Sequence, residues 1–182
     1  MTQSGYDYWR INGCIPHEVC DLLLSYGNWT TAKVGNEKGE IADIRKSEVT
    51  WIDDTFWKSS FYKIICDVNE DSFNYDISGI EGSLQLTQYV APQGHYDYHV
   101  DSFVTPNDKG LTRKLSMVVL LNNPNEFNGG VFEYLTGNHP NEIPLNKGDL
   151  IVFPSYYLHR VTPVTRGKRY SLVCWVEGKP FR

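Results

Sequence analysis

Two histidines and one aspartate are the residues of this sequence best suited to hold a metal ion. His99 and Asp101 are separated by one residue, and His159 follows the apolar run at residues 149–154. In an extended segment residues i and i+2 point to the same face, so both side chains of the first pair can reach one ion. A strand that returns beside this segment would bring His159 to the same ion.

Two imidazoles and one carboxylate on one face of an octahedral ion leave three positions open. This is the ligand set of non-haem iron(II) oxygenases, which need open positions for a chelating co-substrate and for dioxygen. An H-x-D pair alone arises often by chance, and the alternative is an ordinary polar pair near a strand end. The four cysteines form no C-x-x-C pair and do not indicate a zinc site.

The elements that must position these residues change type along the chain. Helices are predicted for residues 15–26 and 57–69, where apolar residues recur at helical spacing. Strands are predicted for residues 29–34, 44–51, 84–89, 115–121, 131–134, 149–153 and 170–175, with turns rich in Gly, Pro and Asn between them, one of them at 36–39. Helices first and strands after predict an α+β, mainly β fold, a sandwich or barrel with the N-terminal helices packed on one sheet.

Length and charge limit the class of protein. The chain has 182 residues, which suits one domain over residues 1–182, and a net charge of −5 that does not favour a nucleic-acid partner. No apolar run is long enough to span a membrane. Scattered cysteines and the absence of a signal peptide predict a cytoplasmic protein.

Four motifs at joint spacing carry a family resemblance. They are YDYHVD at 96–101, GGVF at 129–132, GDLIVFPS at 148–155 and LHRVTPVTRGKRYS at 158–171. Together they closely resemble the iron(II)- and 2-oxoglutarate-dependent dioxygenases, within them the prolyl 4-hydroxylase-like branch, and especially bacterial and phage PKHD-type hydroxylases. The resemblance implies a double-stranded β-helix, a jelly-roll or cupin-like barrel. Residues 1–80 would then form helical support and residues 81–178 the catalytic β-core, in the host cytoplasm if the protein is phage-encoded.

The resemblance also implies roles for individual residues. It places iron(II) on His99, Asp101 and His159, and the distal carboxylate of 2-oxoglutarate on a basic residue ten positions after the second histidine, here Arg169. A guanidinium can grip a carboxylate through two parallel hydrogen bonds. Ser171 shares a face with Arg169 if the segment is a strand, and Tyr89 is the tyrosine that in this branch often donates to 2-oxoglutarate. For Tyr89, a purely packing role is an equal alternative.

The implied activity is hydroxylation that consumes 2-oxoglutarate and O2, with ascorbate in a supporting role. A prolyl or other residue of a peptide or protein is the expected substrate. Alternatives are a small metabolite or free amino acid, a cupin-like metal protein that does not use 2-oxoglutarate, and a non-enzymatic binding module. Fold and cofactor do not decide among substrates.

Overall fold

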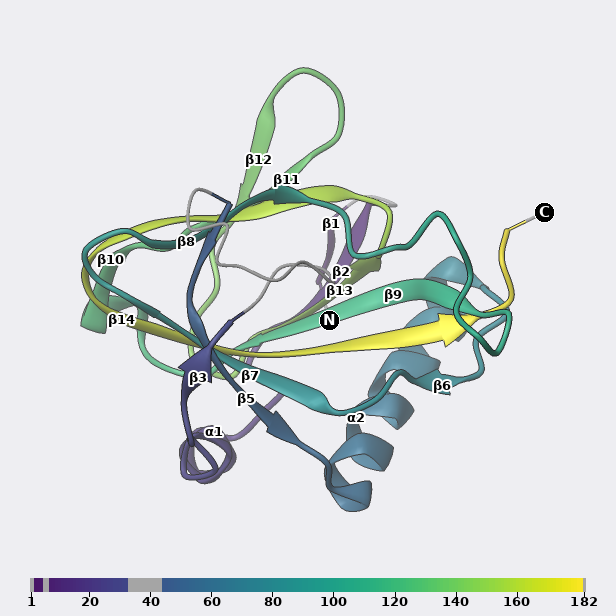
Figure 1. Cartoon of the computed structure of the whole chain (residues 1–182), viewed down its shortest axis with the longest axis horizontal. Helices are drawn as coiled ribbons and strands as arrows, with labels where there is room; N and C mark the ends of the chain where they lie inside the picture. Colours follow the sequence, from purple (N-terminus) through teal and green to yellow (C-terminus); the bar gives the residue numbers. More distant parts are fainter. Residues whose placement is uncertain (1, 5–6, 33–43, 182) are drawn as a thin grey trace.

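Two antiparallel sheets face each other and share their longest strand in the computed structural model, which describes residues 2–4, 7–32 and 44–181 (Figure 1). Across the major sheet the strands lie in the order β1 (Thr2–Ser4), β2 (Tyr8–Ile11), β13 (Leu150–Pro154), β9 (Thr112–Leu120), β14 (Leu158–Gly178), β7 (Leu84–Val90), β5 (Glu48–Ile52) and β3 (Thr30–Thr31). The short strand β6 (Gly79–Ile80) also pairs with β14. The minor sheet contains β12 (Pro140–Ile143), β11 (Phe132–Leu135), the first part of β14, β8 (Gly94–His99) and β4 (Arg45–Lys46), and β10 (Phe127–Gly129) pairs with β14 beside it. This arrangement confirms the predicted double-stranded β-helix.

Strand β14 links the two sheets. Its first part pairs with β8 and β11 in the minor sheet, and residues 168–178 pair with β7 and β9 in the major sheet. The β10–β14 pairing contains a bulge between Asn128 and Gly129, where Gly129 has φ +73°. A Cβ atom there would lie 2.1 Å from the carbonyl oxygen of Pro163, so the close approach of the two strands requires glycine.

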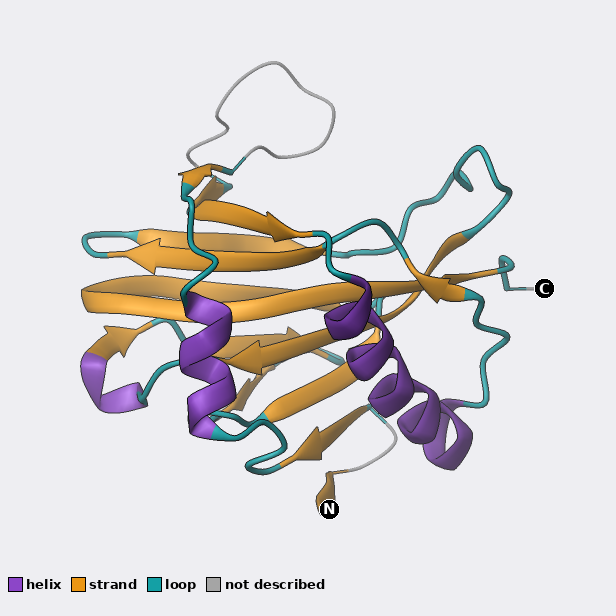
Figure 2. Ribbon diagram, turned by 90° about the horizontal axis from the view of Figure 1, so that it is seen from below, coloured by secondary structure: helices purple, strands orange, loops and turns teal. Residues whose placement is uncertain are grey.

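The helices cover the outer face of the major sheet (Figure 2). They are α1 (His17–Leu24) and α2 (Thr55–Val68), which continues into a π-helical turn η1 (Asn69–Phe73), while a 3-10 turn η2 (Pro124–Glu126) precedes β10. The Asp54 carboxylate accepts a hydrogen bond from the backbone N–H of Trp57 and so begins α2 two residues earlier than predicted. None of the described helices is long and apolar enough to cross a membrane.

Most predicted strands are observed with shifted ends, but the single strand predicted at 44–51 is two strands, β4 in the minor sheet and β5 in the major sheet. The predicted strand at 170–175 lies within the second half of the much longer β14. The first 80 residues also supply strands to both sheets, because β5 pairs with β7 and β4 pairs with β8. The predicted turn at 36–39 and the end of the predicted strand at 29–34 lie outside the described residues. The division into support and β-core near residue 81 stays a prediction.

Two apolar clusters hold the layers together. One lies between the helices and the major sheet and includes Leu23, Phe61, Ile65, Leu86 and Met117. The other lies between the two sheets and includes Val118, Leu120, Phe132, Phe153 and Val164. Strand β9 is therefore buried on both faces from Lys114 to Leu120, and its apolar side chains alternate between the two clusters. Each buried side chain of this size contributes about 1.5–3 kcal/mol.

Candidate metal centre

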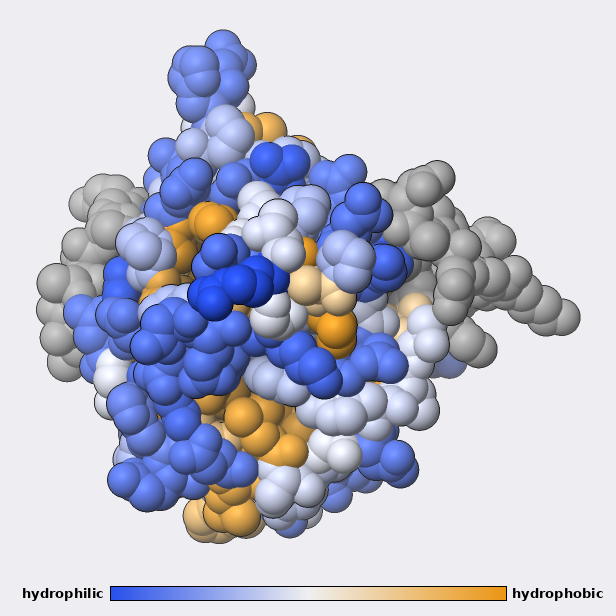
Figure 3. Space-filling view, turned by 90° about the vertical axis from the view of Figure 1, so that its left-hand side faces the viewer, coloured by the Kyte–Doolittle hydropathy of each residue, from blue (hydrophilic) through white to orange (hydrophobic). Residues whose placement is uncertain are grey.

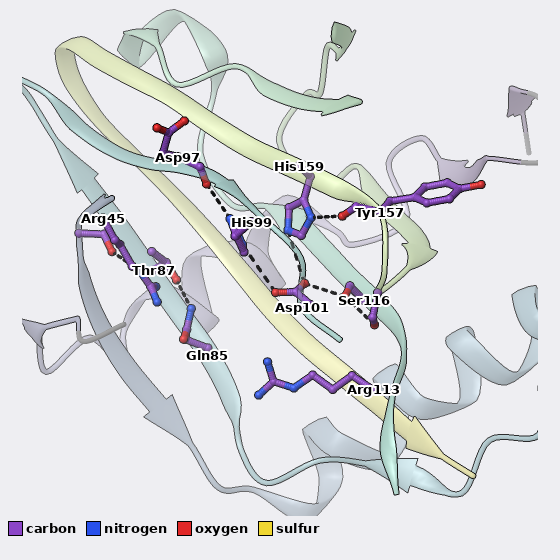
Figure 4. Close-up of polar contacts among 12 residues, drawn as sticks. Arg45, Gln85, Thr87, Asp97, His99, Asp101, Arg113, Ser116, Tyr157 and His159 are labelled. Carbon is purple, nitrogen blue, oxygen red and sulfur yellow. Dashed lines mark hydrogen bonds and ion pairs between the residues drawn. The ribbon is translucent and has the colours of Figure 1, made fainter. Parts of the chain in front are cut away.

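The structure brings His99, Asp101 and His159 together between the two sheets (Figure 4). His99 ends β8 and pairs directly with His159 on β14, while Asp101 follows two residues after His99. One Asp101 oxygen lies 3.6 Å from His99 Nε2 and the other lies 3.5 Å from His159 Nε2. All three donor atoms lie within 4.8 Å of one another, close enough to contact one ion.

Both imidazoles are oriented by the nitrogen that faces away from the cluster. His99 Nδ1 lies 2.8 Å from the backbone oxygen of Asp97, and His159 Nδ1 lies 2.8 Å from that of Tyr157. A carbonyl oxygen can only accept, so each Nδ1 carries the proton and each Nε2 of a neutral ring offers a lone pair. Burial and the neighbouring His159 lower the pKa of His99 to about 4, so this ring is neutral at physiological pH.

A chain of buried hydroxyl groups holds the Asp101 carboxylate. Ser116 Oγ donates to Asp101 Oδ2 over 2.7 Å, and Ser155 Oγ lies 2.9 Å from Ser116 Oγ. Because Ser116 donates its only hydroxyl hydrogen to the carboxylate, Ser155 donates to Ser116. The Ser155 carbonyl oxygen accepts the backbone N–H of Asp101 at 2.9 Å. Burial alone would raise the pKa of Asp101, but the adjacent imidazoles and Ser116 hold it below its ordinary value.

Aromatic rings enclose the cluster on its sheet side. Tyr96 stacks on His99 with ring centroids 3.5 Å apart, and Phe132 and Phe153 pack around His159. The other side opens into a cavity of about 890 Å³ between the sheets. The cluster therefore combines fixed ligands with open positions, which is the arrangement that a reactive metal needs.

A second group of polar residues, centred on Arg169, lines the same cavity. Arg169 is 2 % exposed, and among the described residues no carboxylate forms an ion pair with it. Its Nη1 donates to Ser171 Oγ at 3.1 Å, and its guanidinium lies 5.6 Å from the ring centre of Tyr89, the residue that pairs with it across β7 and β14. Burial lowers the pKa of Arg169 and raises that of Tyr89. A buried cation without a counter-ion indicates that an anion completes the pocket.

The predicted site residues thus line one cavity, whereas other polar residues near the motif do not. The Tyr98 hydroxyl donates to Glu133, which also accepts from Arg160 Nε, so Tyr98 is directed away from the cluster. His95 contacts the backbone oxygen of Gln93 at the sheet edge.

Sequence reasoning missed the Ser116–Ser155 pair that holds Asp101. A signal was present, because a hydroxyl inside the apolar run of β9 needs a buried partner.

The donors fit iron(II) and 2-oxoglutarate. Neutral imidazoles and a carboxylate suit iron(II), and no cysteine lies in the cluster formed by the described residues. Arg169, which has no carboxylate partner among the described residues, and the neighbouring Ser171 hydroxyl and Tyr89 ring suit the remote carboxylate of a dicarboxylic acid.

Facing sheets with an open two-histidine, one-carboxylate cluster define the class of double-stranded β-helix metal proteins. Comparison with known families is more specific, because the family model of the 2OG-Fe(II) oxygenase superfamily matches residues 84–177, just over half of the chain. The chain belongs to this superfamily, whose cofactors are iron(II) and 2-oxoglutarate.

Curated relatives match about half of the chain. A PKHD-type hydroxylase of Teredinibacter turnerae is 42 % identical over 87 residues, which are 47 % of this chain and 38 % of the relative. A PKHD-type hydroxylase of Shewanella frigidimarina is 39 % identical over 86 residues, 46 % of this chain and 38 % of the relative. The matched part therefore spans well under half the length of these relatives.

Solved structures match nearly the whole fold. A prolyl-4-hydroxylase of Pseudomonas putida superposes with a TM-score of 0.73 at 19 % identity, covering 97 % of this chain and 95 % of that one. A viral collagen prolyl hydroxylase from Paramecium bursaria Chlorella virus 1, in its 2-oxoglutarate complex, gives 0.70 at 23 % identity, covering 96 % and 97 %. At these identities the likeness concerns the fold.

Proposed function

We propose that this protein is a hydroxylase in which His99, Asp101 and His159 hold iron(II) and Arg169 anchors 2-oxoglutarate. The observation that carries the proposal is the combination of the open three-donor cluster with a buried, unpaired guanidinium in the same cavity. A cupin-like metal protein that does not use 2-oxoglutarate would have no need for such a cation. Membership of the superfamily also supports a function that uses iron(II) and 2-oxoglutarate.

When bound, iron(II) and 2-oxoglutarate supply the oxidising chemistry, in which one oxygen atom of O2 enters a substrate C–H bond and the other enters succinate, with release of carbon dioxide. The residues of the chain position and protect this chemistry. Arg169 and Ser171 fix the far carboxylate through charge-assisted hydrogen bonds, and the Tyr89 hydroxyl is available to donate a further bond. Phe132, Phe153 and Tyr96 keep water from the sheet side of the ligands.

The proposed substrate is a prolyl or other residue of a peptide or protein. One fold neighbour, a prolyl hydroxylase of Trichoplax adhaerens, was solved with a peptide fragment of a hypoxia-inducible factor, with a TM-score of 0.73 at 20 % identity. The apolar residues exposed around the cavity mouth support a macromolecular substrate over a free amino acid.

Uncoupled turnover of 2-oxoglutarate tests the reaction class. Protein purified without oxygen is supplied with iron(II), ascorbate, 2-oxoglutarate and O2, and succinate is measured by mass spectrometry. We expect succinate from the natural chain and none from Asp101→Ala. Absence of succinate from the iron-loaded natural chain would refute the proposed function.

A pair of arginine variants tests the anchor. Arg169→Gln removes hydrogen bonds to a charged group, each worth about 1.5–3 kcal/mol, so the 2-oxoglutarate concentration for half-maximal turnover should rise about 10- to 100-fold. Arg166→Gln is the matched control, because Arg166 lies three residues earlier on β14 and is exposed. An equal effect of both variants would place the anchor elsewhere.

A further inference from the structure

The cavity mouth contains a cation that the metal and 2-oxoglutarate do not require. Arg45 on β4 lines the cavity, and its Nη2 is buried without a hydrogen-bond partner among the residues that the structure describes. Its Nε donates to Ser47 Oγ at 2.8 Å, and its guanidinium lies 4.6 Å from the ring centre of Tyr96, which itself stacks on His99. The side chain is therefore held beside the metal cluster with one donor group unused.

The charges of the proposed active site balance without Arg45. Iron(II) and Arg169 are balanced by Asp101 and the two carboxylates of 2-oxoglutarate. Arg113, which also lines the cavity and lies below the cluster in the view of Figure 4, forms an ion pair with Glu81. Among the described residues that line the cavity, Arg45 is thus the one cation left without a counter-charge. A carboxylate brought by the substrate would supply it, in the two-bond geometry that guanidinium groups favour.

An apolar lip lines the same cavity as this cation. Trp51 on β5 is 55 % exposed, and Val100, Phe103 and Val104 on the segment after β8 are 48 %, 51 % and 102 % exposed, yet all four line the cavity. Exposed apolar residues gathered at a cavity mouth mark a surface that another molecule covers. They extend the recognition surface beyond the volume that a small metabolite fills.

Phe103 of this lip is held in place by its neighbours. The Arg113 guanidinium lies between two rings, 4.7 Å from the centre of Phe103 and 4.0 Å from that of Trp175. Thr112 Oγ1 donates to the Phe103 carbonyl oxygen at 3.0 Å. Fixed contact groups lower the entropic cost of binding a flexible partner.

We propose that the mouth recognises an acidic peptide segment, in which an Asp or Glu side chain near the target residue pairs with Arg45 while apolar neighbours pack on Trp51 and Phe103. This inference deepens the proposed function, on which it rests for the position of the target residue. It concerns binding, so it can be tested without turnover.

The experiment compares two pools of peptides with a central proline and random flanks, capped at both ends so that no terminal charge remains. One pool allows Asp and Glu in the flanks, and the matched pool has Asn and Gln in their place. The protein is loaded with cobalt(II) and 2-oxoglutarate without oxygen, and peptides retained on it are quantified by mass spectrometry. We expect the acidic pool to be retained about tenfold better than the amide pool.

Two variants on β4 assign that preference. Arg45→Gln should abolish the preference for the acidic pool. Lys46→Gln removes the same charge at the next position and should keep the preference, because Lys46 points away from the cavity toward the Pro92 carbonyl oxygen. Circular dichroism checks that both variants are folded. A third variant, Arg45→Lys, keeps the charge but loses the fork of donors, so its preference for the acidic pool should lie between those of the other two.

Several results would overturn the inference. These are equal retention of the two pools, retention of neither pool, persistence of the preference in Arg45→Gln, and a loss of 2-oxoglutarate affinity in Arg45→Gln as large as that in Arg169→Gln. Retention of neither peptide pool, together with strong binding of free acidic amino acids, would favour a small-molecule substrate instead. The two proposals fail separately, since a protein that selects acidic peptides but releases no succinate refutes only the hydroxylase.

Discussion

Removing the Ser116 hydroxyl should weaken metal binding without removing any ligand. Ser116 is fully buried and donates to Asp101 Oδ2 over 2.7 Å. Ser116→Ala therefore leaves the buried Asp101 carboxylate with one hydrogen bond fewer. Asp101 would still be present, but it would be free to rotate away from the two imidazoles.

The size of the effect follows from this single bond. A hydrogen bond to a charged group is worth about 1.5–3 kcal/mol, and about 1.4 kcal/mol changes an equilibrium constant tenfold. We therefore expect the dissociation constant for iron(II) to rise about 10- to 100-fold, the range typical for residues that orient metal ligands. Ser155→Ala should cost less, because Ser155 acts on the carboxylate through Ser116.

Anaerobic titration with iron(II) or cobalt(II), followed by calorimetry, measures the dissociation constant. Ser102→Ala is the matched control, since Ser102 adjoins Asp101 in sequence but its hydroxyl faces Thr112. In the double variant of Ser116 and Ser155 the two losses should not add. Natural affinity in Ser116→Ala, or full additivity in the double variant, would refute the chain of hydroxyl groups as the holder of Asp101.

Three further predictions concern stability. Gly129→Ala should lower the free energy of unfolding in urea by about 3–5 kcal/mol, against about 1–2 kcal/mol for Gly110→Ala, which has the same φ of +73° but open space around it. In metal-free protein, stability should fall by up to about 3 kcal/mol as pH drops from 6.5 to about 4, because the unfolded chain protonates His99 in this window and the folded one does not. Cobalt(II) at a hundred times its dissociation constant should add about 2.7 kcal/mol, seen as a higher melting temperature.

Each of these has an outcome that contradicts it. Equal losses at Gly129 and Gly110 would mean that the bulge relaxes to admit a side chain. The pH profile is compared with that of His99→Gln, and parallel profiles would show that another group causes the slope. A cobalt-dependent rise in melting temperature that persists in Asp101→Ala would place the metal outside the cluster.

Local patterns in the sequence predicted that the three residues lie together, because His99 and His159 sit on strands that pair directly and Asp101 follows two residues after His99. The alternation of side chains in β8 puts His99 on the cavity face, and the turn signals around residues 84–175 marked the strands. Where strand β14 begins was less predictable. Its first part crosses Pro163 and Gly167, which read as turn residues although the strand continues through them.

The rest of the site depends on contacts between distant residues. Ser116 and Ser155 are 39 positions apart, and Arg45 reaches Tyr96 only because β4 pairs with β8. Nothing in one segment shows which strand will lie beside it. The unused donor of Arg45 likewise appears only once all its neighbours are in place.

The single strand that carries both His159 and Arg169 limits how the gene can vary in length. Because side chains alternate along β14, insertion of one residue between these positions would turn the arginine out of the cavity. The interval pairs with β11 and β10 along one edge and with β8 along the other, so it contains no loop, and the register shifts in these pairings are already part of its geometry. The turn between β11 and β12 protrudes from the molecule with a hydrophilic surface, away from the cavity (Figure 3). Natural insertions and deletions should therefore gather in that turn, while the ten-residue interval in β14 stays constant.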